Sequence, residues 1–115
     1  MPASCSIGVG TILLANVVLT ADVTLGRHVV AMPNAVFTHD NRLDDFATVC
    51  AGVALGGAVH VGRAGYLGMN SSVRERCVVG EHAVLGMGSV LLQDLPDDET
   101  WVGSPARPIN RLVGA

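Results

Sequence analysis

A six-residue period runs without a break through most of this chain and constrains its fold more than any other feature. The position after each apolar repeat residue is often glycine, and the fifth position of each unit is usually small or β-branched. Neither an α-helix nor an alternating strand produces a period of six. The fifteen repeat positions, spaced six apart, are all apolar: Ile7, Leu13, Leu19, Leu25, Ala31, Phe37, Leu43, Val49, Leu55, Val61, Leu67, Val73, Val79, Leu85 and Leu91.

This period predicts a three-sided prism. A short apolar strand followed by a bend, repeated every six residues, forms one side of a coil of eighteen residues. Fifteen units therefore predict about five coils, and residues eighteen apart should lie directly above one another at the spacing of neighbouring strands. We expect an all-β parallel solenoid over residues 7–96, with a lead-in over residues 1–6 and a C-terminal tail over residues 97–115.

The composition suits this fold and excludes several functions. The 115 residues allow one domain, and 50% hydrophobic with only 3% aromatic content predicts an aliphatic core. No apolar run could cross a membrane, and the N-terminus lacks a signal-peptide pattern, so we expect a cytoplasmic protein. A net charge of −3 without a basic run argues against nucleic-acid binding. Cys77, at a small inward position, is predicted to be a reduced core thiol.

One corner column of the expected prism carries alternating charges. It reads Val9, Arg27, Asp45, Arg63 and Glu81. Such a column fits an exposed ladder of ion pairs, and the alternative is an arginine patch for an anionic ligand. We favour the ladder, with a small contribution from each pair.

Four short motifs give the chain a family resemblance. They are Thr38-His39-Asp40, Leu55-Gly56-Gly57, the segment 85–90 with 93–96, and the tail 102–109. With the repeats, they resemble the hexapeptide-repeat acyltransferases, and residues 37–109 resemble the branch that contains sialic acid O-acetyltransferases and UDP-amino-sugar N-acetyltransferases. The resemblance implies a left-handed β-helix, although parallel crossovers are otherwise right-handed. It also implies a homotrimer that uses acetyl-CoA.

The histidine in the first motif is the best candidate for chemistry. His39 lies in a bend, and the position eighteen residues later is Gly57, so the imidazole should lie beside the Gly57 N–H. A general base beside a backbone donor suits acyl transfer from a thioester. The resemblance implies that His39 is the base, Asp40 orients it and Gly57 stabilises the oxyanion. A surface histidine, a turn aspartate and an ordinary repeat glycine remain the alternative interpretation.

The resemblance also implies that acyl-CoA lies in a groove between two prisms of the trimer. Small residues there would let backbone amides approach the ligand. Arg74, Arg76 and Arg107 are possible partners for the CoA phosphates. The predicted cofactor-binding residues are Gly56, Gly57, Gly68, Met69, Gly86 and Met87.

The remaining histidines predict no metal site. The γ-type carbonic anhydrases share the β-helix and bind zinc through three histidines, two of them close in sequence. Here no two histidines are five residues apart, and His28 and His82 lie three coils apart, roughly 14 Å at the strand spacing. We therefore expect no metal.

The expected function is transfer of an acetyl group from acetyl-CoA to an amine or hydroxyl of a sugar or nucleotide-sugar. Relatives usually begin with a nucleotide-sugar-binding domain, whereas six residues precede the first repeat here, so the acceptor stays open. A fragment, a short relative and a prism covered by a partner all fit. Acceptor selection is then expected from the groove and the tail around Trp101. A non-catalytic trimeric scaffold and, less favoured, a metal-dependent hydratase are the alternatives.

Overall fold

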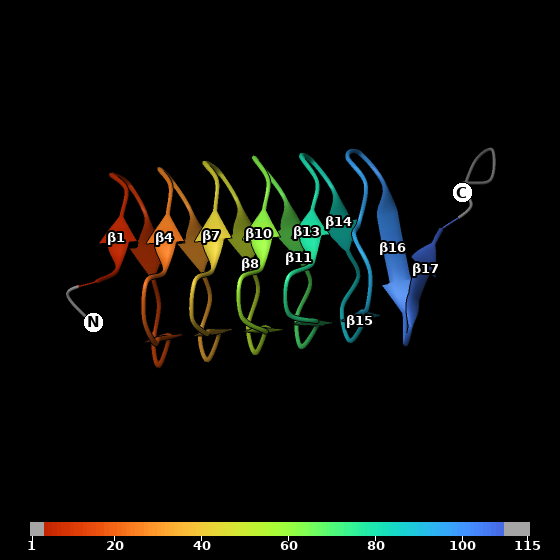
Figure 1. The fold of residues 1–115 in the computed structure, drawn as a ribbon, viewed down its shortest axis with the longest axis horizontal. Coiled ribbons are helices and arrows are strands. Elements are labelled where there is room, and N and C mark those ends of the chain that lie inside the picture. Colours follow the sequence, from red (N-terminus) through yellow and green to blue (C-terminus); the bar gives the residue numbers. More distant parts are fainter. Residues whose placement is uncertain (1–3, 110–115) are drawn as a thin grey trace.

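The chain winds into a three-sided solenoid (Figure 1). The computed structural model describes residues 4–109, and the molecule measures 47 × 24 × 22 Å. Successive coils follow one another along the long axis, with the first and the last strand at opposite ends of the prism (Figure 1). The solenoid predicted from the six-residue period is therefore confirmed.

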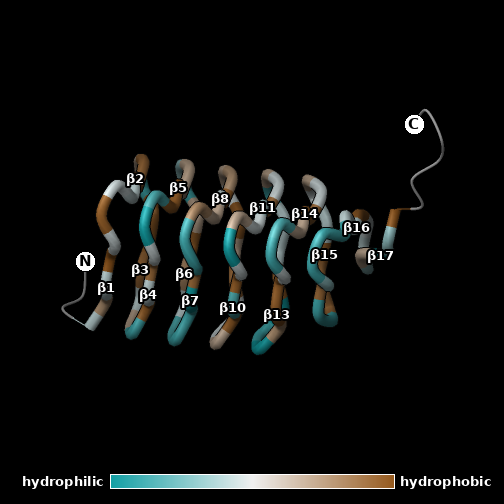
Figure 2. The backbone as a smooth tube through the Cα atoms, turned by 90° about the horizontal axis from the view of Figure 1, so that it is seen from above, coloured by the Kyte–Doolittle hydropathy of each residue, from teal (hydrophilic) through white to brown (hydrophobic). Residues whose placement is uncertain are grey.

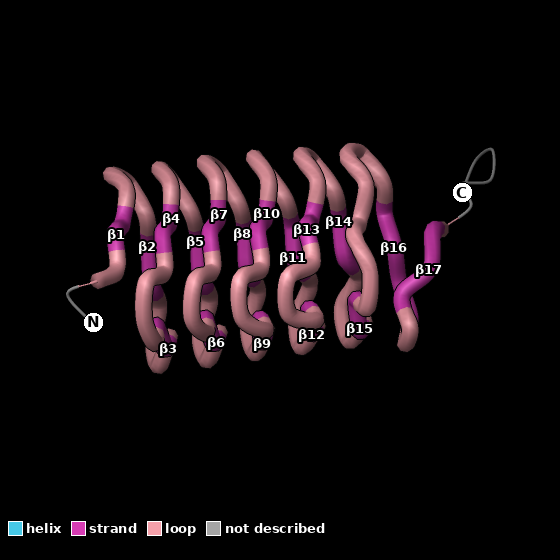
Figure 3. Tube along the Cα trace, viewed as in Figure 1, coloured by secondary structure: helices cyan, strands magenta, loops and turns pink. Residues whose placement is uncertain are grey.

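Residues 4–109 form short strands joined by tight turns, and no helix (Figure 3). No helix that could cross a membrane is found in this part of the chain. The strands are β1 (Ser6–Ile7), β2 (Ile12–Leu13), β3 (Val18–Leu19), β4 (Thr24–Leu25), β5 (Val30–Ala31), β6 (Val36–Phe37), β7 (Arg42–Leu43), β8 (Thr48–Val49), β9 (Ala54–Leu55), β10 (His60–Val61), β11 (Tyr66–Leu67), β12 (Ser72–Val73), β13 (Val78–Val79), β14 (Val84–Leu85), β15 (Val90–Leu91), β16 (Thr100–Gly103) and β17 (Ala106–Pro108).

Three parallel sheets form the sides of the prism. Sheet A has the order β1-β4-β7-β10-β13, sheet B has β17-β16-β14-β11-β8-β5-β2, and sheet C has β15-β12-β9-β6-β3. Paired residues within β1–β15 are eighteen apart, as in Ile7 with Leu25 and Phe37 with Leu55. This register confirms the predicted stacking of about five coils, and it places every turn on one of three edges.

The inward columns predicted from the sequence form the core. Ala31 and Phe37, the smallest and largest repeat residues, are both fully buried in the same coil. The small residues at the fifth positions, such as Val23 and Val59, are buried as well. Cys77 is buried and free, as predicted. Burial raises the pKa of its thiol, because removal from water disfavours the thiolate.

The turns explain the polar residues of the repeat. Most have one residue in the left-handed region, which asparagine, aspartate and glycine adopt most readily. Asn34 and Asp40 are typical, with φ of 67° and 62°. Phe46 adopts the same conformation with φ of 65°, an uncommon choice for a bulky side chain.

The two ends of the prism differ. At the N-terminal end, Ile7, Leu13 and Leu19 pack against the core only in part. At the other end, β16 continues sheet B beside β14, and β17 pairs antiparallel with β16. Trp101 is buried there, and its Nε1–H donates to Glu99 Oε1 at 2.9 Å. Trp101 therefore caps the core, and acceptor selection by the groove and the tail around it stays a prediction.

Candidate active site

The turn between β6 and β7 carries the predicted histidine and aspartate. The distance from His39 Nδ1 to Asp40 Oδ2 is 3.0 Å, and both side chains are largely exposed. A carboxylate only accepts hydrogen bonds, so with an ionised Asp40 the Nδ1 atom carries the proton and donates it. In the neutral imidazole, the lone pair is then on Nε2.

Gly57 lies one coil further along the same edge, directly against the imidazole. A Cβ atom at Gly57 would overlap Cε1 and Nε2 of His39, so any larger residue there would displace the imidazole from this position. The Gly57 N–H has no acceptor within residues 4–109. The sequence register therefore places the pair correctly. We call the edge formed by residues 38–41, 56–59 and 74–77 the His39 edge.

Three hydrogen bonds tie the His39 turn to the turn of the next coil. Thr38 Oγ1 donates to Leu55 O at 2.8 Å, and the Ala58 N–H donates to His39 O at 2.9 Å. The third bond comes from Asn41, whose Nδ2 donates to Gly56 O at 2.8 Å. These bonds fix the backbone of the His39 turn relative to the Gly56–Gly57 peptide, and such fixed geometry favours catalysis.

Asn41 is a residue that the sequence reasoning missed. Its side chain occupies an inward position and is only 1% exposed, and Oδ1 has no donor within residues 4–109. The residues eighteen positions before and after it are Val23 and Val59. A polar residue in that apolar column, directly after the His39-Asp40 pair, was the available signal.

The predicted cofactor-binding residues fall on two different edges. Gly56 and Gly57 belong to the His39 edge, whereas Gly68, Met69, Gly86 and Met87 lie in the turns between sheets B and C. We call this second edge, which includes residues 68–71 and 86–89, the methionine edge. A groove of about 300 Å³ runs beside it and is lined by Met32, Cys50, Ala51, Tyr66, Gly68, Met69 and Met87. Sheet C separates the two edges, so one chain alone does not bring these residues together.

Two of the three candidate arginines lie on the His39 edge. The Arg76 N–H donates to Gly57 O at 2.8 Å, and Arg74 Nε donates to Glu75 Oε1 at 3.4 Å. A backbone hydrogen bond and the bond from Arg74 lower the pKa of Glu75. Arg107 is in β17, at the C-terminal end of the prism.

The predicted charge ladder on the third edge, between sheets A and B, forms only in part. Arg27 Nη2 lies 2.7 Å from Asp45 Oδ2, and this hydrogen-bonded pair lowers the pKa of Asp45. Arg63 instead lies over the Phe46 ring, 4.9 Å from its centroid, and the other partner of that ring is His28. The exposed Phe46 ring thus takes the guanidinium that the ladder would have used.

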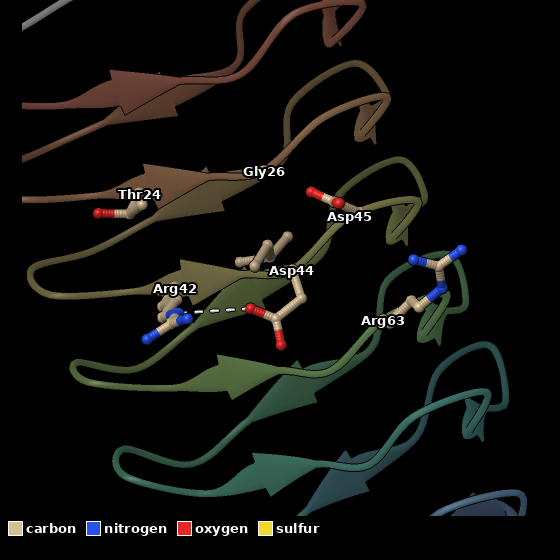
Figure 4. A pocket seen from close by; sticks show the side chains of 7 residues that line it. Thr24, Gly26, Arg42, Asp44, Asp45 and Arg63 are labelled. Atoms are coloured by element: carbon tan, nitrogen blue, oxygen red, sulfur yellow. Dashed lines mark hydrogen bonds and ion pairs between the residues drawn. The ribbon is translucent and has the colours of Figure 1, made fainter.

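Beside this edge, sheet A carries a polar groove of about 320 Å³. Asp44, which lines this groove, belongs to a second histidine–aspartate pair, in which His60 Nε2 lies 2.9 Å from Asp44 Oδ2. Arg42 Nε donates to the other oxygen of Asp44 at 3.3 Å (Figure 4). The carboxylates of Asp44 and Asp45 offset the arginines of the groove, and no arginine-only patch forms. Within residues 4–109, no group of three His, Cys, Asp or Glu side chains could hold a metal ion.

Comparison with known proteins gives sequence relatives. No family model matches the chain. The acyl-[acyl-carrier-protein]–UDP-N-acetylglucosamine O-acyltransferase of Pseudomonas putida (strain W619) is 37% identical over 86 residues, which are 75% of this chain and 33% of that protein. The chain therefore spans about a third of the length of this relative.

Two solved structures match the fold of this chain over nearly all of its length. The acetyltransferase domain of PglB from Neisseria gonorrhoeae FA1090, in complex with acetyl coenzyme A, has a TM-score of 0.92 at 31% identity. The match covers 94% of this chain and 53% of that one. A histidine-to-alanine mutant of GDP-perosamine N-acetyltransferase from Caulobacter crescentus, with CoA and GDP-perosamine, also has a TM-score of 0.92 at 30% identity, covering 96% and 52%.

These likenesses agree with the β-helix fold of the described residues. The sequence relative and both structures are acyltransferases or acetyltransferases, and the match extends over nearly all of the described solenoid. The likeness covers the β-helix and leaves about half of each solved chain unmatched. The chain is thus a homologue of the hexapeptide-repeat acyltransferases and has their β-helix fold.

Proposed function

We propose that the protein transfers an acetyl group from acetyl-CoA to an amine or hydroxyl of a sugar or nucleotide-sugar. The observation that carries this proposal is the position of His39, whose imidazole bonds the Asp40 carboxylate and lies against Gly57. The Gly57 N–H has no acceptor within residues 4–109. Relatives that bind acetyl coenzyme A or act on nucleotide-sugars support the substrate classes.

In the proposed reaction, the acceptor nitrogen or oxygen attacks the thioester carbonyl carbon. His39 Nε2 takes the proton of the attacking group, and the new imidazolium is stabilised by the Asp40 carboxylate. The carbonyl oxygen becomes an oxyanion, which accepts a hydrogen bond from the Gly57 N–H. The tetrahedral intermediate then breaks its carbon–sulfur bond, and the leaving CoA thiolate takes the proton from His39.

The proposed enzyme is a homotrimer, because sheets B and C leave large apolar side chains in solvent. Ile12 and Tyr66 on sheet B are 52% and 42% exposed, and Met87 on the methionine edge is 72% exposed. The outward residues of sheet A are more polar and include Arg42 and His60. Hydrophilic colour accordingly gathers in the turns around β7 and β13, away from the turns near β5 and β8 (Figure 2). Apolar surface of this extent favours association through sheets B and C.

A trimer would also complete the site. The His39 edge of one subunit would face the methionine edge of a neighbour, which unites the two halves of the predicted cofactor-binding set. Sedimentation velocity should then give a particle of about three times the 11.8 kDa chain mass. A monomer at micromolar concentration would contradict the trimer.

The activity is tested by thiol release from acetyl-CoA, measured across UDP-amino sugars, GDP-amino sugars and free sugars. We expect turnover with at least one of these acceptors and binding of CoA by calorimetry. Failure to bind CoA would contradict the proposal and favour the scaffold. Binding of CoA without turnover on any acceptor would contradict the proposed acceptor class only.

A further inference from the structure

We propose that Asn41 is a positioning residue that orients the Gly57 N–H from inside the prism. This inference rests on the proposed function, in which that N–H stabilises the oxyanion. The Gly56 carbonyl and the Gly57 N–H belong to one planar peptide unit and point in opposite directions. A group that holds the carbonyl therefore sets the direction of the N–H. Asn41 is that group, because its Nδ2 donates to Gly56 O at 2.8 Å.

The turn at Gly56 differs from the next turn along the chain. There, the Gly62 carbonyl accepts a hydrogen bond from the Gly65 N–H at 3.0 Å, which closes the turn locally. Within residues 4–109, the Gly56 carbonyl accepts no such bond from the Val59 N–H and accepts one from the Asn41 side chain. The peptide beside His39 is thus held by a side chain of the preceding coil. A hydrogen bond to its carbonyl also polarises the peptide and makes its N–H a better donor.

Thr11 makes the equivalent hydrogen bond to a turn carbonyl, and all the polar atoms of its side chain have partners. Thr11 Oγ1 donates to Gly26 O at 2.8 Å, across the same fifteen-residue separation, and it also accepts the Val29 N–H at 3.1 Å. The acceptor of Asn41, Oδ1, is buried without a donor within residues 4–109. Asparagine therefore carries a desolvation penalty that threonine would avoid. A residue that lowers local stability, as Asn41 does here, is expected mainly at a functional site.

The neighbouring coils supply matched variants. Asn41→Val places in this position the residue that its column uses at Val23 and Val59, so the variant should fold, with a urea midpoint equal to or above that of the parent protein. It removes the donor to Gly56 O. Asn41→Thr restores a donor by the arrangement seen at Thr11.

The kinetic experiment compares both variants in thiol release. We expect Asn41→Val to lower kcat by about 10-fold to 100-fold, somewhat less than complete loss of an oxyanion donor. The KM for acetyl-CoA should change by about twofold or less, because the bond acts on the transition state. Asn41→Thr should recover most of kcat. Parental kcat in Asn41→Val, or equal losses in both variants, would overturn the inference.

A second measurement needs no substrate. In amide NMR spectra, Asn41→Val should shift the Gly57 resonance and change its hydrogen exchange more than Asn41→Thr does. An unchanged Gly57 amide in Asn41→Val would overturn the inference even if the protein proves to be inactive. Conversely, absence of turnover in the parent protein together with the expected Gly57 change would count against the proposed function and leave the role of Asn41 standing.

Discussion

The molecule contains two histidine–aspartate pairs of nearly equal length that differ in their surroundings. His39 and Asp40 are 3.0 Å apart on an edge, and His60 and Asp44 are 2.9 Å apart on the face of sheet A. The His39 imidazole lies against Gly57, whose N–H is unpaired within residues 4–109. His60 instead lies in β10, where its neighbours on the two adjacent strands are Arg42 and Val78. His39 is therefore the better candidate base of the two histidines, because a possible oxyanion donor lies beside it.

The largest effect that separates the two pairs is expected from removal of each imidazole. His39→Ala should lower kcat by about 10²-fold to 10⁴-fold, the usual contribution of a general base. His60→Ala should change kcat by about twofold or less, because that side chain lies outside the proposed site. Thiol release from acetyl-CoA measures both. Similar losses in the two variants would erase the distinction, and full activity of His39→Ala would remove the proposed base.

The next effect concerns the contact between His39 and Gly57. In Gly57→Ala, the new Cβ would displace the imidazole, and we expect kcat to fall by about 10²-fold, as for other displaced catalytic groups. The same clash should lower the urea midpoint of unfolding. In a His39→Ala background the clash is absent, so Gly57→Ala should then cost little stability. A double-mutant cycle measures this coupling, and additive effects would contradict the contact.

The register that places Gly57 beside His39 could be predicted from the sequence, because three six-residue sides make a coil of eighteen residues. The same period located the core columns and the turns. What it did not predict depends on side-chain direction. Arg63 takes Phe46 as its partner in preference to the charge ladder. Asn41 turns inward to Gly56 O, and Trp101 covers the end of the core. Each of these choices follows from contacts between coils that periodicity leaves open.

A smaller effect is expected from the two carboxylates. Asp40→Asn keeps the size of the side chain and removes its charge. The His39 imidazolium should then be less stabilised, and the proton of the neutral ring should be held less firmly on Nδ1. We expect kcat to fall by about 10-fold, within the range for support of a general base. Asp44→Asn should leave kcat unchanged, because Asp44 contacts His60 and Arg42 on sheet A and not His39. Thiol release between pH 6 and 9 measures both variants. A loss in Asp44→Asn equal to that in Asp40→Asn would contradict the assignment.

The smallest effect is expected at the Arg27–Asp45 pair, which shows what an exposed carboxylate pair does when it serves only the fold. Hydrogen bonds and charge attraction from Arg27 lower the folded-state pKa of Asp45. The pair therefore stabilises the protein above the unfolded-state pKa of this carboxyl, and the stabilisation is lost as pH falls through the lower folded-state value. Urea unfolding should show a small advantage of the parent protein over Arg27→Ala near pH 6, and this advantage should vanish near pH 2. The advantage should also shrink in 1 M salt, because the screening length there is only about 3 Å. A stability advantage that grows on acidification would contradict this prediction. The kcat should be the same in both proteins, because the Arg27–Asp45 pair lies on a different edge from His39.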